Sequence, residues 1–293
     1  MKLGLNANTF AASDNMESVC GLANEFGIKY LELWATNLEK TDGSINRFAF
    51  KGTDIQKAKK VIADHGLLVC VIGFGCGLDR YFVNSPQLFS DELMRAIDIA
   101  AELGAKVINH YIDEIHPYPK LDYKYLDKFF KAPLEYAEKT GIIFALENEA
   151  HDITQSPLNM LALINHYDSK SFKTNFDATN YFQASCEGFP YAYEVLKEHI
   201  AYVHIKNGCR YNPEFCKDKE WLGGKMSREN TGTHIYYLEA KSGAVNIDGL
   251  LNRLFEDGYE GYCSLEPHTT RQRAIDCIKS EVAYLRSKCM FTE

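Results

Sequence analysis

The sequence predicts an α/β fold, a closed (β/α)₈ TIM barrel, for three reasons. Short aliphatic and β-branched runs alternate eight times with longer stretches of helical periodicity, which is typical of parallel α/β proteins. The 293 residues, 46% of them hydrophobic, match one barrel of roughly 250 residues with an insertion better than two small domains. Acidic and imidazole side chains recur at the ends of the later runs, where barrels gather their site residues. We therefore expect a single barrel domain over residues 1–293.

The eight apolar runs are the expected strands, and each has the length of a strand rather than of a helix. They cover residues 2–7, 28–34, 67–74, 106–111, 142–147, 172–177, 201–206 and 261–266. The stretches that follow them carry the helical pattern. We expect these helices to begin near Ser13, Thr53, Pro86, Asp122, Pro157, Glu187, Asp248 and Arg271.

Several element boundaries carry their own signals. Ser85 before Pro86, and Ser156 before Pro157, predict helix N-caps with proline in the first turn. A glycine stands between a helical run and the next strand at five places, where a residue that tolerates positive φ can end the helix. These glycines are Gly27, Gly66, Gly104, Gly141 and Gly258.

One interval, between Asn207 and Gly243, breaks the rhythm and is too long for an ordinary connection. Because it follows the carboxyl end of a strand, we expect it to lie over the barrel mouth as a lid or a subunit contact, not as a second domain. Its residues Arg210, Arg228 and His234 are expected to face solvent, with contact to an anionic substrate as the alternative.

Charge and cysteine content limit the classes of function. The formal net charge of −8 disfavours non-specific binding to nucleic acid, and no run approaches the roughly 20 apolar residues of a membrane helix. The first residues lack a signal-peptide pattern, and the nine cysteines include no CxxC pair, so we expect reduced thiols and a cytoplasmic protein. Zinc binding by Cys209 and Cys216 is a minor alternative.

Four potential metal ligands end the last four expected strands: Glu147, Asp177, His204 and Glu266. Taken singly, each carboxylate could cap a helix and the histidine could be a core residue. Together they stand at the same level of consecutive strands, and three buried acids without a cation would repel one another. Three carboxylates and one imidazole predict an open site for one divalent cation. Mn²⁺, Mg²⁺ or Co²⁺ suits these ligands, and Zn²⁺ also fits.

Other polar residues at strand ends are expected to contact substrate. Lys206 lies two residues after His204, Glu149 two after Glu147, and His268 two after Glu266. His110 ends the fourth expected strand and could orient a hydroxyl. A surface ion pair for the lysine and a core position for the histidine are the alternatives.

Two aromatic residues, Trp34 and Phe74, end the second and third expected strands. Their rings could cover a sugar or simply pack in the core. Glu32 shares the strand parity of Trp34, so it could point into the barrel and orient a ligand. No glycine-rich phosphate loop is present.

Several segments resemble the xylose isomerase-like TIM-barrel superfamily, the sugar phosphate isomerase/epimerase group. They are LENEAHDITQSPLNMLALIN, VHIKN and GAVNIDGLLNRLFEDGYEGYCSLEPH, and the similarity spans nearly the whole chain. The resemblance implies a metal held by Glu147, Asp177, His204 and Glu266, and it assigns proton transfer through an enediolate to Glu147 and Glu266. It also implies a sugar as the small-molecule substrate and association into a homo-oligomer.

The sequence departs from the family pattern after Asp177. An Asp-x-x-His is common there, but Asn180 stands in the histidine position. This loss argues against the three-zinc endonuclease branch, and we expect Asn180 to contact a substrate hydroxyl. The resemblance thus favours a metal-dependent sugar isomerase or epimerase. A dehydratase of an inosose or a dehydroshikimate-like compound is the main alternative, ahead of DNA cleavage and of sugar binding without catalysis.

Overall fold

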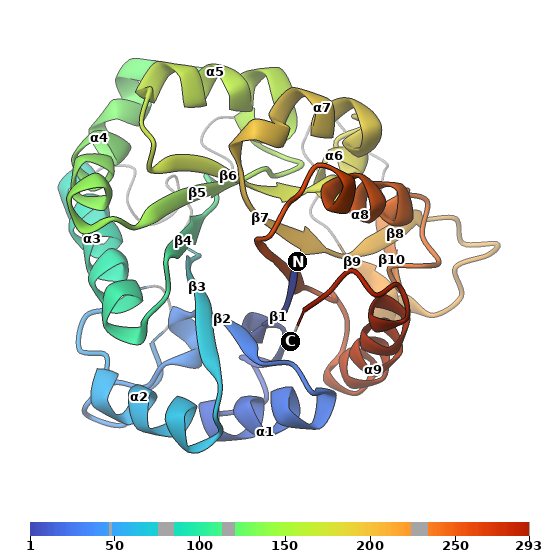
Figure 1. Ribbon diagram of the computed structural model, residues 1–293, viewed down its shortest axis with the longest axis horizontal. Coiled ribbons are helices and arrows are strands. Elements are labelled where there is room, and N and C mark those ends of the chain that lie inside the picture. The colour runs from blue at the N-terminus through green and yellow to red at the C-terminus, as the bar shows by residue number, and fades with distance from the viewer. Residues whose placement is uncertain (47–48, 76–84, 113–120, 224–233, 293) are drawn as a thin grey trace.

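Eight parallel strands close into a barrel in the computed structural model, which describes residues 1–46, 49–75, 85–112, 121–223 and 234–292 (Figure 1). The strand order around the barrel is β1-β11-β7-β6-β5-β4-β3-β2. The predicted fold class is therefore confirmed. The barrel strands are β1 (Lys2–Asn6), β2 (Tyr30–Trp34), β3 (Leu68–Phe74), β4 (Val107–His110), β5 (Ile143–Glu147), β6 (Phe172–Asp177), β7 (Ile200–Ile205) and β11 (Tyr262–Leu265).

Helices follow the strands and cover the outside of the barrel. They are α1 (Met16–Phe26), α2 (Ile55–Asp64), α3 (Pro86–Leu103), α4 (Tyr123–Thr140), α5 (Pro157–Tyr167), α6 (Ala178–Gln183), α7 (Tyr193–Leu196), α8 (Ile247–Glu256) and α9 (Arg271–Ser287). All five predicted glycine stops have positive φ, between 67° and 80°. Pro86 and Pro157 begin their helices as predicted, but neither Ser85 nor Ser156 caps its helix with its side chain. In the described residues, no helix is long and apolar enough to span a membrane.

The segment between β6 and β7 differs from the single helix predicted to begin near Glu187. The helix α6 begins directly after β6, with Asp177 as its N-cap. A π-helical turn (Gly188–Ala192) then separates α6 from the short α7. Phe189 is extended inside that turn, with φ −142° and ψ 130°. Gly188 packs so closely on Ala178 that a Cβ would lie 2.4 Å from its carbonyl oxygen. This close contact and the extended residue interrupt the helix.

The interval 207–243 contains a small antiparallel sheet beside the barrel, with strand order β8-β10-β9. Its strands are β8 (Asn207–Arg210), β9 (Leu222–Gly223) and β10 (Ile235–Leu238), and they extend outward at the right of Figure 1. Asn207 fixes the base of this insertion, because its Nδ2 donates to the carbonyls of Ala240 and Val245 at 2.7 and 2.9 Å. Gly243 lies against that amide, where a Cβ would clash at 2.0 Å.

The core has two parts. A large apolar layer between strands and helices includes Phe89, Phe129 and Phe144, all fully buried. Each such ring contributes about 1.5–3 kcal/mol through burial. Inside the barrel, a small cluster around Val71 and Tyr202 fills the lower level, and polar side chains occupy the level above it.

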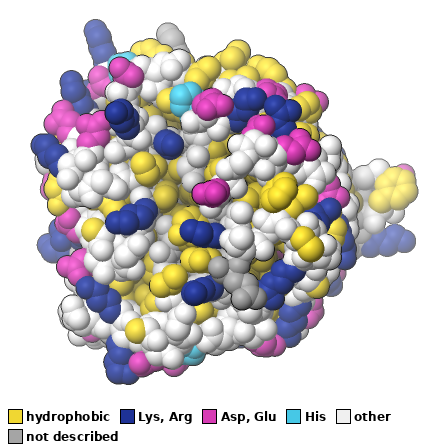
Figure 2. All heavy atoms as spheres, viewed as in Figure 1, with side chains coloured by type: hydrophobic (Ala, Val, Ile, Leu, Met, Phe, Trp, Pro, Cys, Tyr) yellow, Lys and Arg dark blue, Asp and Glu magenta, His cyan; other side chains and the backbone are white. Residues whose placement is uncertain are grey.

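Figure 2 shows the face on which both chain ends lie, where basic and acidic side chains are interspersed.

Candidate metal centre

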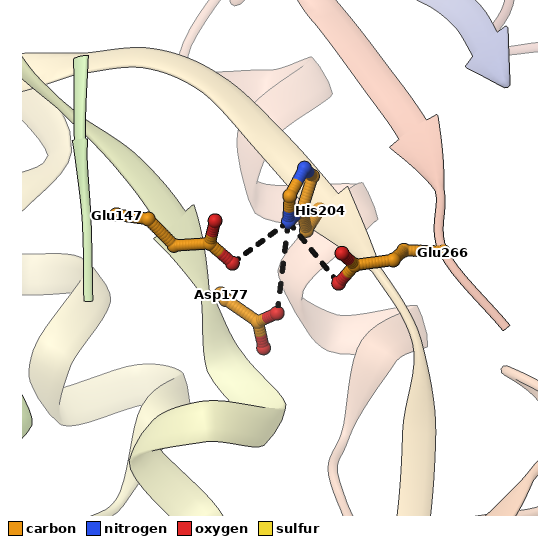
Figure 3. Close-up of side chains that lie close together, drawn as sticks. All are labelled: Glu147, Asp177, His204 and Glu266. Carbon is orange, nitrogen blue, oxygen red and sulfur yellow. Dashed lines mark hydrogen bonds and ion pairs between the residues drawn. The ribbon is translucent and has the colours of Figure 1, made fainter. Parts of the chain in front are cut away.

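The four predicted ligands converge at the carboxyl ends of β5, β6, β7 and β11 (Figure 3). One ligand atom from each of Glu147, Asp177, His204 and Glu266 lies within 4.8 Å of all the others. The Nδ1 atom of His204 is 2.9 Å from Glu147 Oε1, 3.3 Å from Glu266 Oε2 and 4.0 Å from Asp177 Oδ2. In Figure 3, Glu147 and Glu266 approach this nitrogen from opposite sides.

Asparagine side chains hold the two glutamates. Asn109 on β4 donates to Glu147 Oε2 at 2.9 Å, and Asn6 on β1 donates to Glu266 Oε1 at 3.0 Å. Each bond occupies one carboxylate oxygen and leaves the other directed at His204. The sequence analysis missed both asparagines. A polar residue within an apolar strand, at the level of the ligands, is the signal that could have identified them.

Asp177 combines the helix cap and the ligand position that the sequence left as alternatives. Its Oδ1 accepts hydrogen bonds from the backbone N–H groups of Thr179 and Asn180, both at 2.8 Å, and so caps α6. Its Oδ2 instead lies 2.9 Å from the Nζ atom of Lys206. The same carboxylate can therefore cap the helix and bind a cation.

Strong electrostatic coupling follows from the burial of these groups. Burial opposes charge on His204, yet the nearby carboxylates of Glu147, Glu266 and Glu32 raise the pKa of its imidazole well above the usual value. Burial also opposes ionisation of Glu266, but His204, Lys206 and His268 together lower its pKa well below the usual range. Burial raises the pKa of Asp177, and only part of this effect is offset by Lys206.

A divalent cation fits this donor set. Two ligands on opposite sides of an ion with bonds of about 2.1 Å lie about 4.2 Å apart, which is compatible with the observed spread of 4.8 Å. The ammonium of Lys206 contacts Glu266 Oε2 at 2.8 Å and also contacts Asp177. Two of the candidate ligand oxygens therefore already have a positively charged neighbour. Three carboxylates and an imidazole, arranged in this way, can hold Mn²⁺, Mg²⁺, Co²⁺ or Zn²⁺.

Three residues predicted to contact substrate lie near the cluster. Lys206 is buried, with only 4% of its surface exposed, whereas His268 is half-exposed and its Nε2 lies 3.2 Å from Glu266 Oε2. Glu149 faces His151 at 3.6 Å, and burial raises the pKa of its carboxyl to about 8. Arg273 on α9 does not belong to this group of residues, because its guanidinium pairs with two carboxylates of the insertion, Asp218 and Glu220.

Trp34 and Glu32 point inward, whereas Phe74 packs outward among core rings. The Trp34 ring lies directly on Gly73 and Gly75, where added Cβ atoms would clash at 2.3 and 2.5 Å. Its Nε1 donates to Glu32 Oε1 at 3.1 Å. The inward orientation predicted for Glu32 is therefore confirmed.

The substrate contact expected of His110 stays a prediction, and the contacts described for this residue match its core alternative. Its ring stacks on Phe74 and meets Phe89 and Phe144 on the outer face of β4, and its Nδ1 lies 2.8 Å from the Phe74 carbonyl oxygen. Asn109 occupies the inward position of that strand instead. Asn180 is also buried, and its Nδ2 donates to the Asn148 carbonyl at 2.8 Å, so this amide supports the site's backbone.

The predicted residues of the insertion divide into three cases. Arg210 is not free in solvent, because it donates to the carbonyls of Phe182 and Gln183 and lies over the Phe182 ring. His234 is exposed, as predicted, and Arg228 lies outside the described residues. The thiols of Cys209 and Cys216 lie 4.0 Å apart. The barrel cluster is the only group of three or more metal-ligand side chains in the described residues, so the zinc alternative at this pair has no support.

A pocket of about 450 Å³ opens from the cluster toward the insertion. Glu266 and His268 form its inner wall. The remaining lining residues come from the chain after β1, from the insertion and from the segment after β11: Asn8, Thr9, Glu220, Leu222, Pro267, Thr269 and Thr270. The volume lies within the usual range for small-molecule sites.

Solved structures share this architecture at low sequence identity. The IolI protein with a bound zinc atom has 16% identity and a TM-score of 0.73, and the match covers 100% of both chains. The probable 3-DHS dehydratase AsbF of Bacillus anthracis has 16% identity over 98% of this chain and 99% of that chain, with a TM-score of 0.70. The 3-keto-D-glucoside 4-epimerase YcjR of E. coli has 17% identity over 98% and 99%, with a TM-score of 0.68.

Sequence comparison gives the family. A search of curated protein sequences finds no significant match. The sequence model of the xylose isomerase-like TIM barrel family, however, matches residues 20–288, which is most of the chain. The chain belongs to the xylose isomerase-like TIM barrel family.

Proposed function

We propose that this protein is a divalent-metal-dependent sugar isomerase or epimerase in which Glu147 and Glu266 transfer protons. The observation that carries the proposal is the approach of these two carboxylates from opposite sides of His204 Nδ1, at 2.9 and 3.3 Å, above the carboxylate of Asp177. Two acid/base groups on either side of one site are what proton removal and return at a sugar carbon require.

The cation would be held by Glu147, Asp177, His204 and Glu266. When bound, it would polarise the carbonyl and hydroxyl oxygens of the sugar and make the neighbouring C–H more acidic. Mn²⁺, Mg²⁺ and Co²⁺ are the expected ions, with Zn²⁺ as a further option.

The protein's own groups would move the proton. The positive charges of His204, Lys206 and His268 lower the pKa of Glu266, so this residue carries no proton and has a lone pair free to accept one. The amides of Asn6 and Asn109 each hold one oxygen of a glutamate and so fix the orientation of both carboxylates in the site. Return of the proton to the same carbon from the opposite side gives an epimer, and transfer to the neighbouring carbon gives an isomer.

Substrate would enter through the 450 Å³ pocket beside Glu266 and His268. We propose that Lys206 donates to a sugar oxygen, since its ammonium already lies at the ligand oxygens. Trp34 would cover the apolar side of the sugar ring, and Glu149 and Asn180 would contact sugar hydroxyls.

A panel of D-ketoses and D-aldoses tests this function. Protein loaded with Mn²⁺ or Co²⁺ is incubated with each sugar in D₂O, and products are analysed by NMR. We expect at least one sugar to give an isomer or epimer with deuterium at the reacting carbon. The variants Glu147→Gln and Glu266→Gln should each lose about 10²–10⁴-fold in rate. Failure of the metal-loaded protein to turn over any sugar would count against the proposal.

One contact favours a dehydratase as the second candidate. His268 Nε2 lies 3.2 Å from Glu266 Oε2 and 3.5 Å from Lys206 Nζ, on the pocket side. An imidazole there could protonate a departing hydroxyl after a proton is removed. Mass spectrometry separates the two functions, because dehydration removes one water from the substrate and isomerisation leaves its mass unchanged.

A further inference from the structure

We infer that Glu32 is a positioning residue for His204, and that it fixes which imidazole nitrogen faces the cation. The inference rests on the proposed metal function and adds to it a residue outside the ligand set. Both oxygens of Glu32 contact the Nε2 atom of His204, at 3.1 and 3.0 Å. The Nδ1 atom of the same ring faces Glu147 and Glu266 instead.

The two ring nitrogens therefore have different carboxylate partners. A histidine that binds a metal through one nitrogen commonly donates its other N–H to a carboxylate, and this hydrogen bond sets the tautomer and the ring orientation. With a cation bound and Glu32 as the acceptor, the one ring proton would lie on Nε2, and the lone pair of Nδ1 would point into the ligand cluster.

The side-chain amide of Asn175 also contacts His204 but does not favour one ring nitrogen over the other. Its Nδ2 lies 3.2 Å from Nδ1 and 3.3 Å from Nε2 of His204, which are nearly equal distances. The hydroxyl of Tyr202 is 3.3 Å from Nε2, longer than either contact to Glu32. Glu147 and Glu266 contact Nδ1 but would serve the cation as ligands, so Glu32 is the carboxylate left to accept a proton from the ring, at Nε2.

The side chains around Glu32 supply hydrogen-bond donors to its carboxylate. The residue is completely buried, and its Oε1 accepts from Trp34 Nε1 at 3.1 Å, Tyr202 OH at 3.3 Å and Asn6 Nδ2 at 3.4 Å. An ionised carboxylate only accepts hydrogen bonds, so it can satisfy all these donors together with His204. Glutamine has one acceptor oxygen, and its NH₂ group would face at least one donor.

The same contacts link Glu32 to a second ligand. Asn6 donates to Glu32 and also to Glu266, at 3.4 and 3.0 Å. A change at Glu32 should therefore loosen His204 directly and Glu266 through the Asn6 amide. Removal of such an outer partner typically weakens metal binding by about 10–100-fold.

The test compares Glu32→Gln with Glu92→Gln in the full-length protein. Glu92 is a matched control, because it is also buried and accepts from the Phe50 N–H at 2.9 Å, but it lies on α3 outside the barrel. Co²⁺ binding is measured by isothermal titration calorimetry and by visible absorption of the bound ion. We expect the Co²⁺ Kd of Glu32→Gln to rise about 10–100-fold with an altered spectrum, and that of Glu92→Gln to stay at the wild-type value.

The outcomes separate the two proposals. If wild-type protein binds Co²⁺ and Glu32→Gln binds it equally well, the Glu32 inference is overturned and the metal site stands. If wild-type protein binds no Co²⁺, the proposed metal function fails, and this inference fails with it. Should the glutamine variant not fold, ¹⁵N-histidine NMR of the Zn²⁺-loaded wild type decides. A proton on His204 Nε2 supports the inference, and a proton on Nδ1 contradicts it.

Discussion

Asn148 holds the backbone of Asp177 on both sides of its Cα atom. Its Oδ1 accepts from the Asp177 N–H at 2.8 Å, and its Nδ2 donates to the Asp177 carbonyl at 2.9 Å. Asn148 immediately follows the candidate ligand Glu147 at the end of β5, and Asp177 is the last residue of β6. One fully buried amide thus couples the positions of two candidate ligands.

Replacement of Asn148 by alanine should therefore affect both folding and metal binding. The change removes both hydrogen bonds from the Asn148 side chain to the buried Asp177 backbone, which should lower the free energy of unfolding by about 2–4 kcal/mol. It should also weaken Co²⁺ binding. Urea denaturation and calorimetry measure the two effects. Asn159→Ala is the control, because it removes one hydrogen bond to Ile153 away from the site. Unchanged Co²⁺ affinity in Asn148→Ala would show that the coupling is unimportant.

Lys206→Met should change metal-free stability and metal affinity in opposite directions. Removing the ammonium leaves Asp177 and Glu266 without their buried cation, which should destabilise the metal-free protein by about 3–5 kcal/mol. The loss of positive charge beside two ligand oxygens should at the same time tighten binding of Mn²⁺ or Co²⁺. Denaturation in chelator and calorimetric titration test this pair of effects, with exposed Lys241→Met as control. A variant that binds the ion more weakly would contradict the prediction.

Glu281 should make stability depend on pH. This buried carboxylate on α9 accepts from the Ala240 N–H at 2.8 Å, and burial raises its pKa from 4.5 to about 7. The folded protein favours the neutral acid, so protonation of Glu281 contributes to the free energy of unfolding. This contribution is fully present below pH 4.5 and is lost as the pH rises through about 7. A shift from 4.5 to about 7 corresponds to about 3 kcal/mol.

The variant Glu281→Gln keeps a neutral side chain at every pH. It should match the wild type near pH 4.5 and exceed it by up to about 3 kcal/mol at pH 8. Urea denaturation in chelator between these limits measures the difference. The exposed Glu256→Gln substitution on α8 should give no such trend. A constant difference between wild type and Glu281→Gln across this range would rule out the assigned pKa.

Much of the barrel could be predicted because its determinants are local. Aliphatic runs and glycines such as Gly104 and Gly141 mark strands and helix ends by their own conformational preferences, and the structure agrees with them. The convergence of Glu147 and Asp177 follows from strand ends alone, because parallel strands present their carboxyl ends at one rim.

The sequence carries less information where burial on both faces of a strand removes the alternation of polar and apolar residues. In KVINHY, each side chain of β4 is buried, so alternation could not tell inward Asn109 from outward His110. The two hydrogen bonds between the Asn148 side chain and the Asp177 backbone depend on the alignment of two strands, so no local sequence pattern indicates them. The broken helix after Asp177 depends on the contact of Gly188 with Ala178, which is a tertiary contact.

The proposed function depends on one divalent cation held by Glu147, Asp177, His204 and Glu266. The most direct measurement is anomalous X-ray diffraction from a crystal soaked in Mn²⁺, recorded on both sides of the manganese absorption edge. We expect one anomalous peak bonded to all four residues at about 2.0–2.3 Å. Absence of a peak at these residues under saturating Mn²⁺ would contradict it.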